Sequence, residues 1–373
     1  MNEIVDWVKR LQAAEHSRQP KLSPNFRRML IPGWEPAHFD GFLRTQGQHA
    51  FTPFGGTPTS FSVLEWLDVA RSGAQTLSEL PPQIGGLLTL VTDRKVMVLN
   101  ELDTVLQGTD SHTFLPLYHH ADARLASPLN LGGATVNELF RDRLAQLCSI
   151  SAKKQRVLQE AISLHYGAVL LYEVDLAAAY TLVVAGIEAL SREFGEPPSS
   201  WSKWDKSEPW DTLMKDIHLK EEQKAKIRAH LMKDKQMRLK ETFVNYVIDA
   251  LPESMWDEDW KEWMYSITMS ASGSDYTPGK GQWSRNDKVR DHLTTDREKL
   301  RASLKKTYNA RSGFVHEGKR SINFLSHIQT TLIPDYNKPL PFSILRTILS
   351  ALIRYELDRN SSAFKLPEIE IHS

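Results

Sequence analysis

The spacing of apolar residues changes near residue 134. From Ala134 onward, apolar positions recur at three- and four-residue intervals, which is typical of amphipathic helices. This spacing predicts helices over 135–149, 152–170, 174–194 and 341–359, and two or three charged helices within 211–250. We therefore expect the C-terminal part of the chain to be an all-α bundle.

The N-terminal part has a mixed pattern. Residues 3–14 fit a short amphipathic helix. Residues 20–60 are rich in Pro, Gly and aromatic residues and poor in periodicity, which predicts an irregular but packed segment. Two apolar runs around a polar turn in 87–99 predict a pair of strands, and 104–118 adds further strand.

Together these patterns predict an α+β protein with two domains. Gly132–Gly133 separates an N-terminal mixed α/β domain, residues 1–133, from a C-terminal helical domain, residues 134–373. A charged stretch at about 199–285 is predicted to be a helical insertion in the second domain. We expect the first domain to sense a trigger or to regulate the second.

The composition narrows the class of protein. The 373 residues carry 46 basic and 46 acidic side chains, so the net charge is zero. A neutral chain is unsuited to coating nucleic acid without sequence preference, although it leaves room for a local basic site. Cys148 is the only cysteine, which excludes an intramolecular disulfide and a multi-cysteine metal site. The sequence has no run of about 18 apolar residues and no signal-peptide pattern, so we expect a cytoplasmic protein.

Two other groups of residues could suggest a metal site or a nucleic-acid contact, and we expect neither. Segment 119–122 offers three possible metal ligands in one loop without a fourth, so we expect no metal and no other cofactor. The residues Trp256, Trp260 and Trp263 recur at helical spacing. Core packing explains that stripe better than base stacking does.

The candidate chemistry lies at the end of one predicted helix. Thr295 and Glu298 have the spacing of a capping box, so the helix is expected to begin there. At about 100° per residue, Arg311 lies within roughly 20° of the apolar positions Leu300 and Leu304. Arg311 therefore continues an apolar face, where a guanidinium stays charged and needs an anionic partner.

A histidine follows this arginine after four residues. His316 would lie about 140° further round if the helix continued, away from the face of Arg311. Gly313 lies between them and is expected to end or bend the helix. The two side chains could then converge.

These residues belong to the segment Tyr308-Asn309-x-Arg311-Ser312-x-x-x-His316-x-Gly318. The segment resembles the signature of HEPN-domain proteins, in particular the Apea-like HEPN branch. The resemblance covers about residues 150–360 and implies a helical, metal-independent endoribonuclease that acts as a homodimer, in anti-phage defence or a toxin-like role. Residues 185–190 also resemble the first conserved helix of that family, where an acidic residue, here Glu188, can face the arginine.

The residue types suit this reaction. RNA is cut without a metal when its own 2′-hydroxyl attacks the adjacent phosphate, which requires proton transfer and a cation. His316 suits proton transfer because imidazole titrates near neutrality, and Arg311 suits the phosphate oxygens. The alternative is that Arg311 bridges to a carboxylate and His316 caps a helix end, in a catalytically inactive HEPN module that binds RNA or mediates assembly.

A basic patch surrounds the motif. Residues 301–320 carry one acidic residue, Glu317, and six basic ones, a local charge of +5. The six are Arg301, Lys305, Lys306, Arg311, Lys319 and Arg320. Lys305, Lys319 and Arg320 are candidates for contact with the RNA backbone. The alternative is a solvated helix face.

Three supporting residues also have two interpretations each. Asn309 and Ser312 either hydrogen-bond a phosphate or a base, or form a turn. Glu188 either orients Arg311 or forms an ordinary i,i+4 pair with Arg192. The sequence does not decide between these interpretations.

Overall fold

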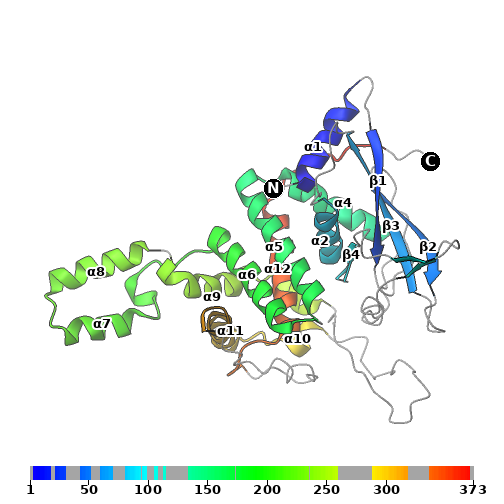
Figure 1. Cartoon of the computed structure of the whole chain (residues 1–373). Helices are drawn as coiled ribbons and strands as arrows, with labels where there is room; N and C mark the ends of the chain where they lie inside the picture. The colour runs from blue at the N-terminus through cyan, green and yellow to red at the C-terminus, as the bar shows by residue number, and fades with distance from the viewer. Residues whose placement is uncertain are drawn as a thin grey trace, which may run out of the picture. The chain divides into compact units, whose positions relative to one another are not determined.

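The computed structural model describes most of the predicted helices. The described residues are 3–17, 22–30, 43–51, 59–69, 80–93, 95–98, 105–107, 112–114, 133–172, 174–234, 236–258, 288–317 and 336–369. They are mostly helical (Figure 1). The chain divides into two compact units: the first contains Met1–Leu170 and Leu357–Ser373, and the second contains Leu171–Trp260 and Ser284–Glu356.

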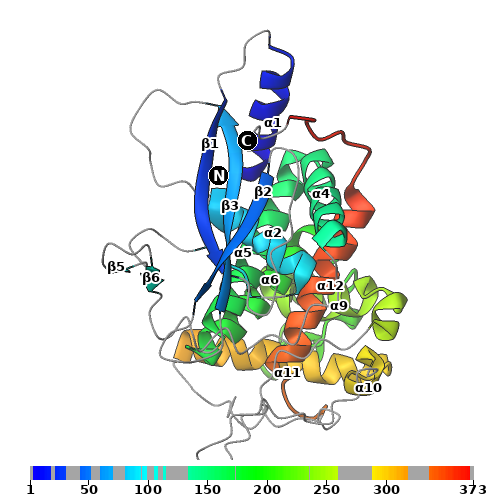
Figure 2. The same cartoon turned by 90° about the vertical axis from the view of Figure 1, so that its right-hand side faces the viewer.

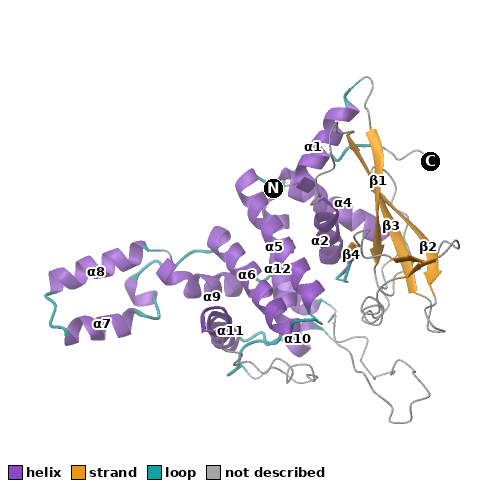
Figure 3. Cartoon of the chain, in the orientation of Figure 1, coloured by secondary structure: helices purple, strands orange, loops and turns teal. Residues whose placement is uncertain are grey.

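The strands of the first unit pair in a four-stranded antiparallel sheet (Figure 3). They are β1 (Leu22–Leu30), β2 (Leu43–Phe51), β3 (Thr59–Val69) and β4 (Met97–Val98), in the order β2-β3-β1-β4. The segment 20–60, expected to be irregular, therefore contributes two strands. Pro and Gly are depleted in strands, so this composition argued against them. Strand formation also depends on pairing partners, which the local sequence does not show. The short strands β5 (Val105–Gln107) and β6 (His112–Phe114) confirm the strand predicted in 104–118.

Helices pack against this sheet in the first unit (Figure 2). They include α1 (Glu3–Glu15) and α2 (Leu80–Thr92). Helix α1 is fixed to β3 by a hydrogen bond from the Trp7 indole nitrogen to the Leu67 carbonyl, 2.6 Å long, and by the Arg10–Asp68 ion pair at 3.1 Å. The helix predicted over 3–14 is thus confirmed.

The strand pair predicted for 87–99 is wrong. Leu87–Thr92 forms the second half of α2, and only Met97–Val98 is a strand. A short apolar run fits a buried helix as well as a buried strand, so its periodicity was uninformative. Close packing favours the helix: a Cβ at Gly85 would lie 2.9 Å from the Tyr166 hydroxyl oxygen.

The two compact units do not divide at residue 133. Helices α4 (Gly133–Ser149) and α5 (Ala152–Leu171) confirm the predicted helices there. However, α4 contacts α1 and α2, and the first unit continues to Leu170. The sequence therefore changes from strand to helix periodicity near residue 134, whereas the first compact unit ends at Leu170.

Three helices of the second unit contact one another and contribute to its core. These are α6 (Leu176–Phe194), α9 (Leu239–Ala250) and α11 (Arg297–Glu317). The Asp175 carboxylate caps α6 by accepting from the Ala178 amide at 3.0 Å, and Gly195 follows the helix end as predicted. Helix α12 (Phe342–Asn360) confirms the helix predicted over 341–359.

The predicted insertion at 199–285 is partly wrong. Within it lie α7 (Ser207–Asp216), α8 (Glu221–Lys233) and α9. None of the residues of α8 is buried, but Phe243, Val244 and Val247 of α9 are fully buried, and α9 contacts both α6 and α11. The prediction grouped α9 with its charged neighbour α8, although α9 has an apolar face that packs in the core.

The remaining segments are short. They are η3 (Trp201–Lys203), η4 (Gln236–Arg238), η5 (Glu253–Asp257) and α10 (Val289–His292). Trp256 is buried in η5, a 3-10 helix rather than an α-helix, whereas Trp260 and Trp263 lie outside the described residues.

Helix α11 also fixes the entry to α12. The Thr307 hydroxyl accepts a hydrogen bond from the Leu340 amide at 2.9 Å, and the Tyr180 hydroxyl donates to the Leu340 carbonyl at 3.1 Å. Thr307 and Tyr180 are buried, and burial raises the pKa of the Tyr180 phenol, so both remain neutral partners. Both polar groups of the buried Leu340 backbone are thereby satisfied.

We expect Thr307→Val to lower the free energy of unfolding by about 1–3 kcal/mol, because it keeps the side-chain shape and leaves the buried Leu340 amide without its acceptor. Urea unfolding measures the change. Thr347→Val is the matched control, since the half-buried Thr347 hydroxyl donates only to a carbonyl of its own helix. Equal effects of the two changes would contradict the role given to Thr307.

Candidate functional site

Helix α11 carries the candidate residues and begins later than predicted. The Asp296 carboxylate accepts from the amides of Glu298 and Lys299, at 3.0 and 3.2 Å, and so caps the helix in place of Thr295. Leu300 and Leu304 are buried as expected. The sequence contained both capping candidates, and only the backbone geometry distinguishes them.

Arg311 contacts a buried carboxylate on a neighbouring helix. Its guanidinium lies 3.6 Å from Oε2 of Glu188, and the side chains of Arg311 and Glu188 are 21% and 6% exposed. The other oxygen of Glu188, Oε1, accepts a hydrogen bond from Arg192. The two interpretations of Glu188 are therefore both correct: it pairs with Arg192 and faces Arg311.

The helix continues through Gly313 to Glu317, so the prediction that Gly313 ends it is wrong. A Cβ at Gly313 would meet no atom within 4 Å, so the glycine serves no close approach in the described part of the chain. In a regular helix the positions of Arg311 and His316 differ by about 140° around the axis. The backbone thus places the two residues on different faces of α11; the His316 side chain lies outside the described part.

Tyr308 connects this ion pair to α9. Its ring lies 5.4 Å from that of Phe243, centroid to centroid. Burial raises the pKa of Tyr308, and the negative charge of Glu188 adds to this effect, while Arg311 opposes it. The phenol therefore remains protonated and can act as a hydrogen-bond donor beside the arginine.

The other predicted residues fall into three groups. Lys305 lies 3.7 Å from Asp205 and is not directed to the Glu188–Arg311 pair. Asn309 is exposed and Ser312 is half-buried, both within the helix rather than in a turn. Lys319 and Arg320 lie outside the described residues.

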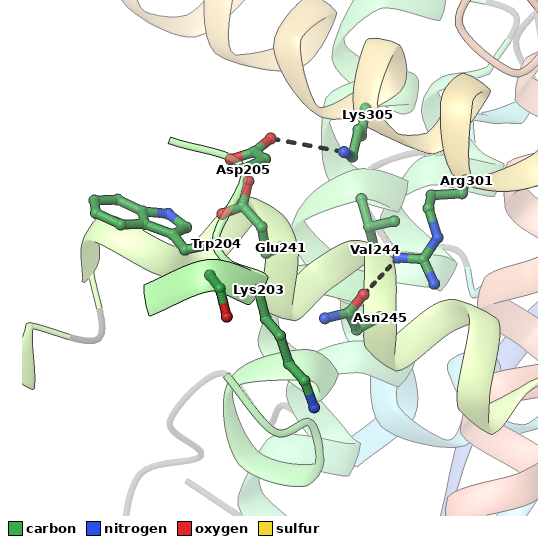
Figure 4. Close-up of a pocket in the computed structure, with 9 residues that line it drawn as sticks. Lys203, Trp204, Asp205, Glu241, Val244, Asn245, Arg301 and Lys305 are labelled. Atoms are coloured by element: carbon green, nitrogen blue, oxygen red, sulfur yellow. Dashed lines mark hydrogen bonds and ion pairs between the residues drawn. The ribbon is translucent and has the colours of Figure 1, made fainter. Parts of the chain in front are cut away.

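A pocket opens beside the first half of α11 (Figure 4). Its volume is about 130 Å³, and η3, α9 and α11 supply its walls. Asp205 and Glu241 lie together on one side, with Arg301 and Lys305 opposite them (Figure 4). Sequence reasoning missed Asp205 and Glu241, because neither has a sequence neighbour that signals a site.

The two carboxyl groups of this pocket share an environment but differ in charge. Glu241 is 4% exposed, and burial, together with the adjacent Asp205, raises its pKa to about 7. Burial alone would raise the pKa of Asp205 too, but Glu241 and the charges of Lys240 and Lys305 outweigh it and lower that pKa. Near pH 7 the pair therefore carries between one and two negative charges, with Asp205 ionised.

Other chemistry finds little support in the described residues. They contain no group of three His, Cys, Asp or Glu side chains that could hold a metal ion, and segment 119–122 lies outside them. Burial raises the pKa of the Cys148 thiol to about 12, so it is not a nucleophile. No helix in the described ranges is long and apolar enough to span a membrane.

Comparison with known proteins adds no relative. The chain matches no protein-family model, no curated protein and no solved structure. The likeness to HEPN domains therefore rests on the motif residues alone.

The raised pKa of Glu241 has a consequence for stability. Its ordinary value is 4.5, so between about pH 5 and pH 7 the folded chain binds a proton that the unfolded chain has lost, and stability falls as the pH rises. Between pH 6 and pH 8 this titration lowers the free energy of unfolding by about 1 kcal/mol. We expect that part of the decrease to be absent in Glu241→Gln. Urea unfolding at both pH values measures it. The exposed Glu222→Gln is the control and should leave the pH dependence unchanged; an unchanged slope in Glu241→Gln would contradict the assignment.

Proposed function

We propose that the protein is a metal-independent endoribonuclease in which Arg311 and His316 cleave RNA. The observation that carries the proposal is the Glu188–Arg311 contact. A carboxylate that is 6% exposed holds a guanidinium that is still 21% exposed, so the arginine is oriented and yet accessible. The arginine that is held in this way, Arg311, is the arginine of the motif and lies five residues before His316.

The residue types supply the needed chemistry. The guanidinium of Arg311 donates several hydrogen bonds and stabilises the charge that builds on the phosphate. One of its donors, Nε, and the Oε2 atom of Glu188 are both buried and have no hydrogen-bond partner in the described part of the chain, so any phosphate contact uses the other donors of the guanidinium. His316 would take the proton from the 2′-hydroxyl or deliver one to the leaving 5′-oxygen.

A second function is supported by the same contact. The Glu188–Arg311 pair also fits an arginine that serves packing, in a HEPN-like module that binds RNA or mediates assembly without cutting. In that case Arg311 would stabilise the fold, since α6 and α11 meet at this ion pair. Activity and stability measurements on the same variants separate the two functions.

We expect Arg311→Ala and His316→Ala each to reduce RNA cleavage by about 10²–10⁴-fold, the usual contribution of such groups. The assay uses purified full-length protein with mixed RNA in EDTA, and the products should end in 2′,3′-cyclic phosphates. Lys299→Ala removes an exposed charge from the same helix and is the control. Full cleavage by either motif variant, or cleavage that EDTA abolishes, would refute the mechanism.

The positions of the two residues on α11 support a homodimer as part of this proposal. Because Arg311 and His316 lie on different faces of one helix, a composite site needs the arginine of one chain and the histidine of another. A two-fold axis brings the same surface of two chains together, so two such pairs form at once. Glu188, Glu317 or bound RNA must offset the mutual repulsion of the two basic patches.

Mixing the Arg311→Ala and His316→Ala chains tests this assembly. If the site is shared, the mixed dimer contains one intact pair of two and should recover up to about half of the wild-type activity per dimer. The measurement is RNA cleavage after co-refolding or co-expression of the two chains. Cleavage by a wild-type protein that stays monomeric in light scattering would contradict the shared site.

We further propose that the sheet-containing unit regulates the nuclease, in a cytoplasmic defence or toxin-like role with a phage-derived or other trigger. Host RNA must be protected until such a trigger arrives. A truncation at residue 134 is unsuitable for testing this, because α4 and α2 contact each other within one unit. Candidate triggers should instead be added to the full-length chain.

A further inference from the structure

The pocket beside α11 presents opposite charges on facing walls. The Asp205 side chain is 24% exposed and that of Lys305 is 36% exposed, so both can be reached from solvent. Their charged atoms are 3.7 Å apart, beyond hydrogen-bonding distance. Arg301 lies beside Lys305 and is held by a 2.6 Å hydrogen bond to the Asn245 side chain (Figure 4). A ligand would therefore contact Asp205 and Lys305 side by side, since a separation of 3.7 Å admits no atom between them.

Charge disfavours a simple cation and opposes a phosphate at one wall of the pocket. A phosphate group would face the ionised Asp205, and a simple cation would face Arg301, Lys305 and Lys203. The volume of about 130 Å³ is well below the 300–1,000 Å³ of pockets for drug-sized ligands. The pocket therefore suits a small neutral group that has hydrogen-bond donors next to acceptors.

Nucleobases are such groups, and they differ in the order of donors and acceptors along their edges. Guanine has two adjacent N–H donors next to a carbonyl oxygen, with a ring nitrogen acceptor beyond. Adenine and cytosine have an amino donor next to a ring acceptor, and uracil has one N–H between two carbonyls. Among these four bases only guanine matches a carboxylate beside two cations. The two oxygens of the carboxylate can accept from both N–H groups of guanine.

We propose that this pocket binds a guanine base, with Asp205 accepting from N1–H and N2–H and with Lys305 and Arg301 donating to O6 and N7. Buried Glu241, neutral below about pH 7, adds little negative charge while Asp205 stays ionised. Lys305 and Arg311 are six residues apart, about 9 Å along one helix. The base would then belong to the RNA near the cleaved bond, an assignment that rests on the proposed nuclease function.

Binding of mononucleotides tests the pocket without any cleavage. We expect the full-length protein to bind guanosine 5′-monophosphate at least about tenfold more tightly than adenosine 5′-monophosphate in titration calorimetry at pH 6, where Glu241 is neutral. Inosine 5′-monophosphate lacks the N2 amino group and should bind with intermediate affinity. The common phosphate cancels in these comparisons. Equal affinity for all three nucleotides would overturn the proposal.

Variants locate the binding. Asp205→Asn should weaken guanosine monophosphate binding by about 10- to 100-fold and leave adenosine monophosphate binding unchanged, because an amide offers only one acceptor. Asp216→Asn, at an exposed position, is the matched control. Lys305→Gln should also weaken guanosine monophosphate binding, and it keeps Asp205 in place should Asp205→Asn unfold the chain. Preserved discrimination in both pocket variants would refute the site.

The outcomes also separate this proposal from the nuclease. Guanine-selective binding without any RNA cleavage would support the pocket and refute the nuclease. RNA cleavage together with equal nucleotide affinities would refute the pocket only. If both hold, cleavage products from mixed RNA should be enriched in cuts next to guanosine, and Asp205→Asn should reduce that enrichment.

Discussion

A buried carboxylate is the constraint around which the second unit is arranged. Glu188 is charged and almost fully buried, and an unpaired charge there would be unfavourable by several kcal/mol. Arg192 satisfies one of its oxygens from the same helix, and Arg311 approaches the other from α11. The requirement to pair this charge therefore fixes where the arginine of the motif lies.

Helix α9 supports both candidate sites. Phe243 packs against Tyr308, which stands beside Arg311, while Glu241, Val244 and Asn245 line the pocket. Because α9 contacts both α6 and α11, a shift of this helix would alter the ion pair and the pocket together. The two candidate sites thus share one packed helix.

The tertiary structure also changes the meaning of the basic patch. Arg311 faces Glu188 and Lys305 faces Asp205, so two of its cations already have acidic neighbours. Those partners come from segments more than 90 residues away. The local field is therefore weaker than +5 suggests.

The periodicity of apolar residues was enough to predict most helices, because the buried face of an amphipathic helix is visible in the order of its residues. Helices α5, α6 and α12 lie close to their predicted bounds. The same reasoning found Arg311, and the family resemblance added Glu188. Neither found Asp205 and Glu241, whose proximity arises only from the tertiary structure. Sequence reasoning also misassigned Leu87–Thr92, where an apolar run fits two structures, and Gly313, where the helix simply continues. Local sequence fixes local conformation, whereas pairing of strands, pairing of charges and the altered pKa of Glu241 depend on contacts between residues far apart in the chain.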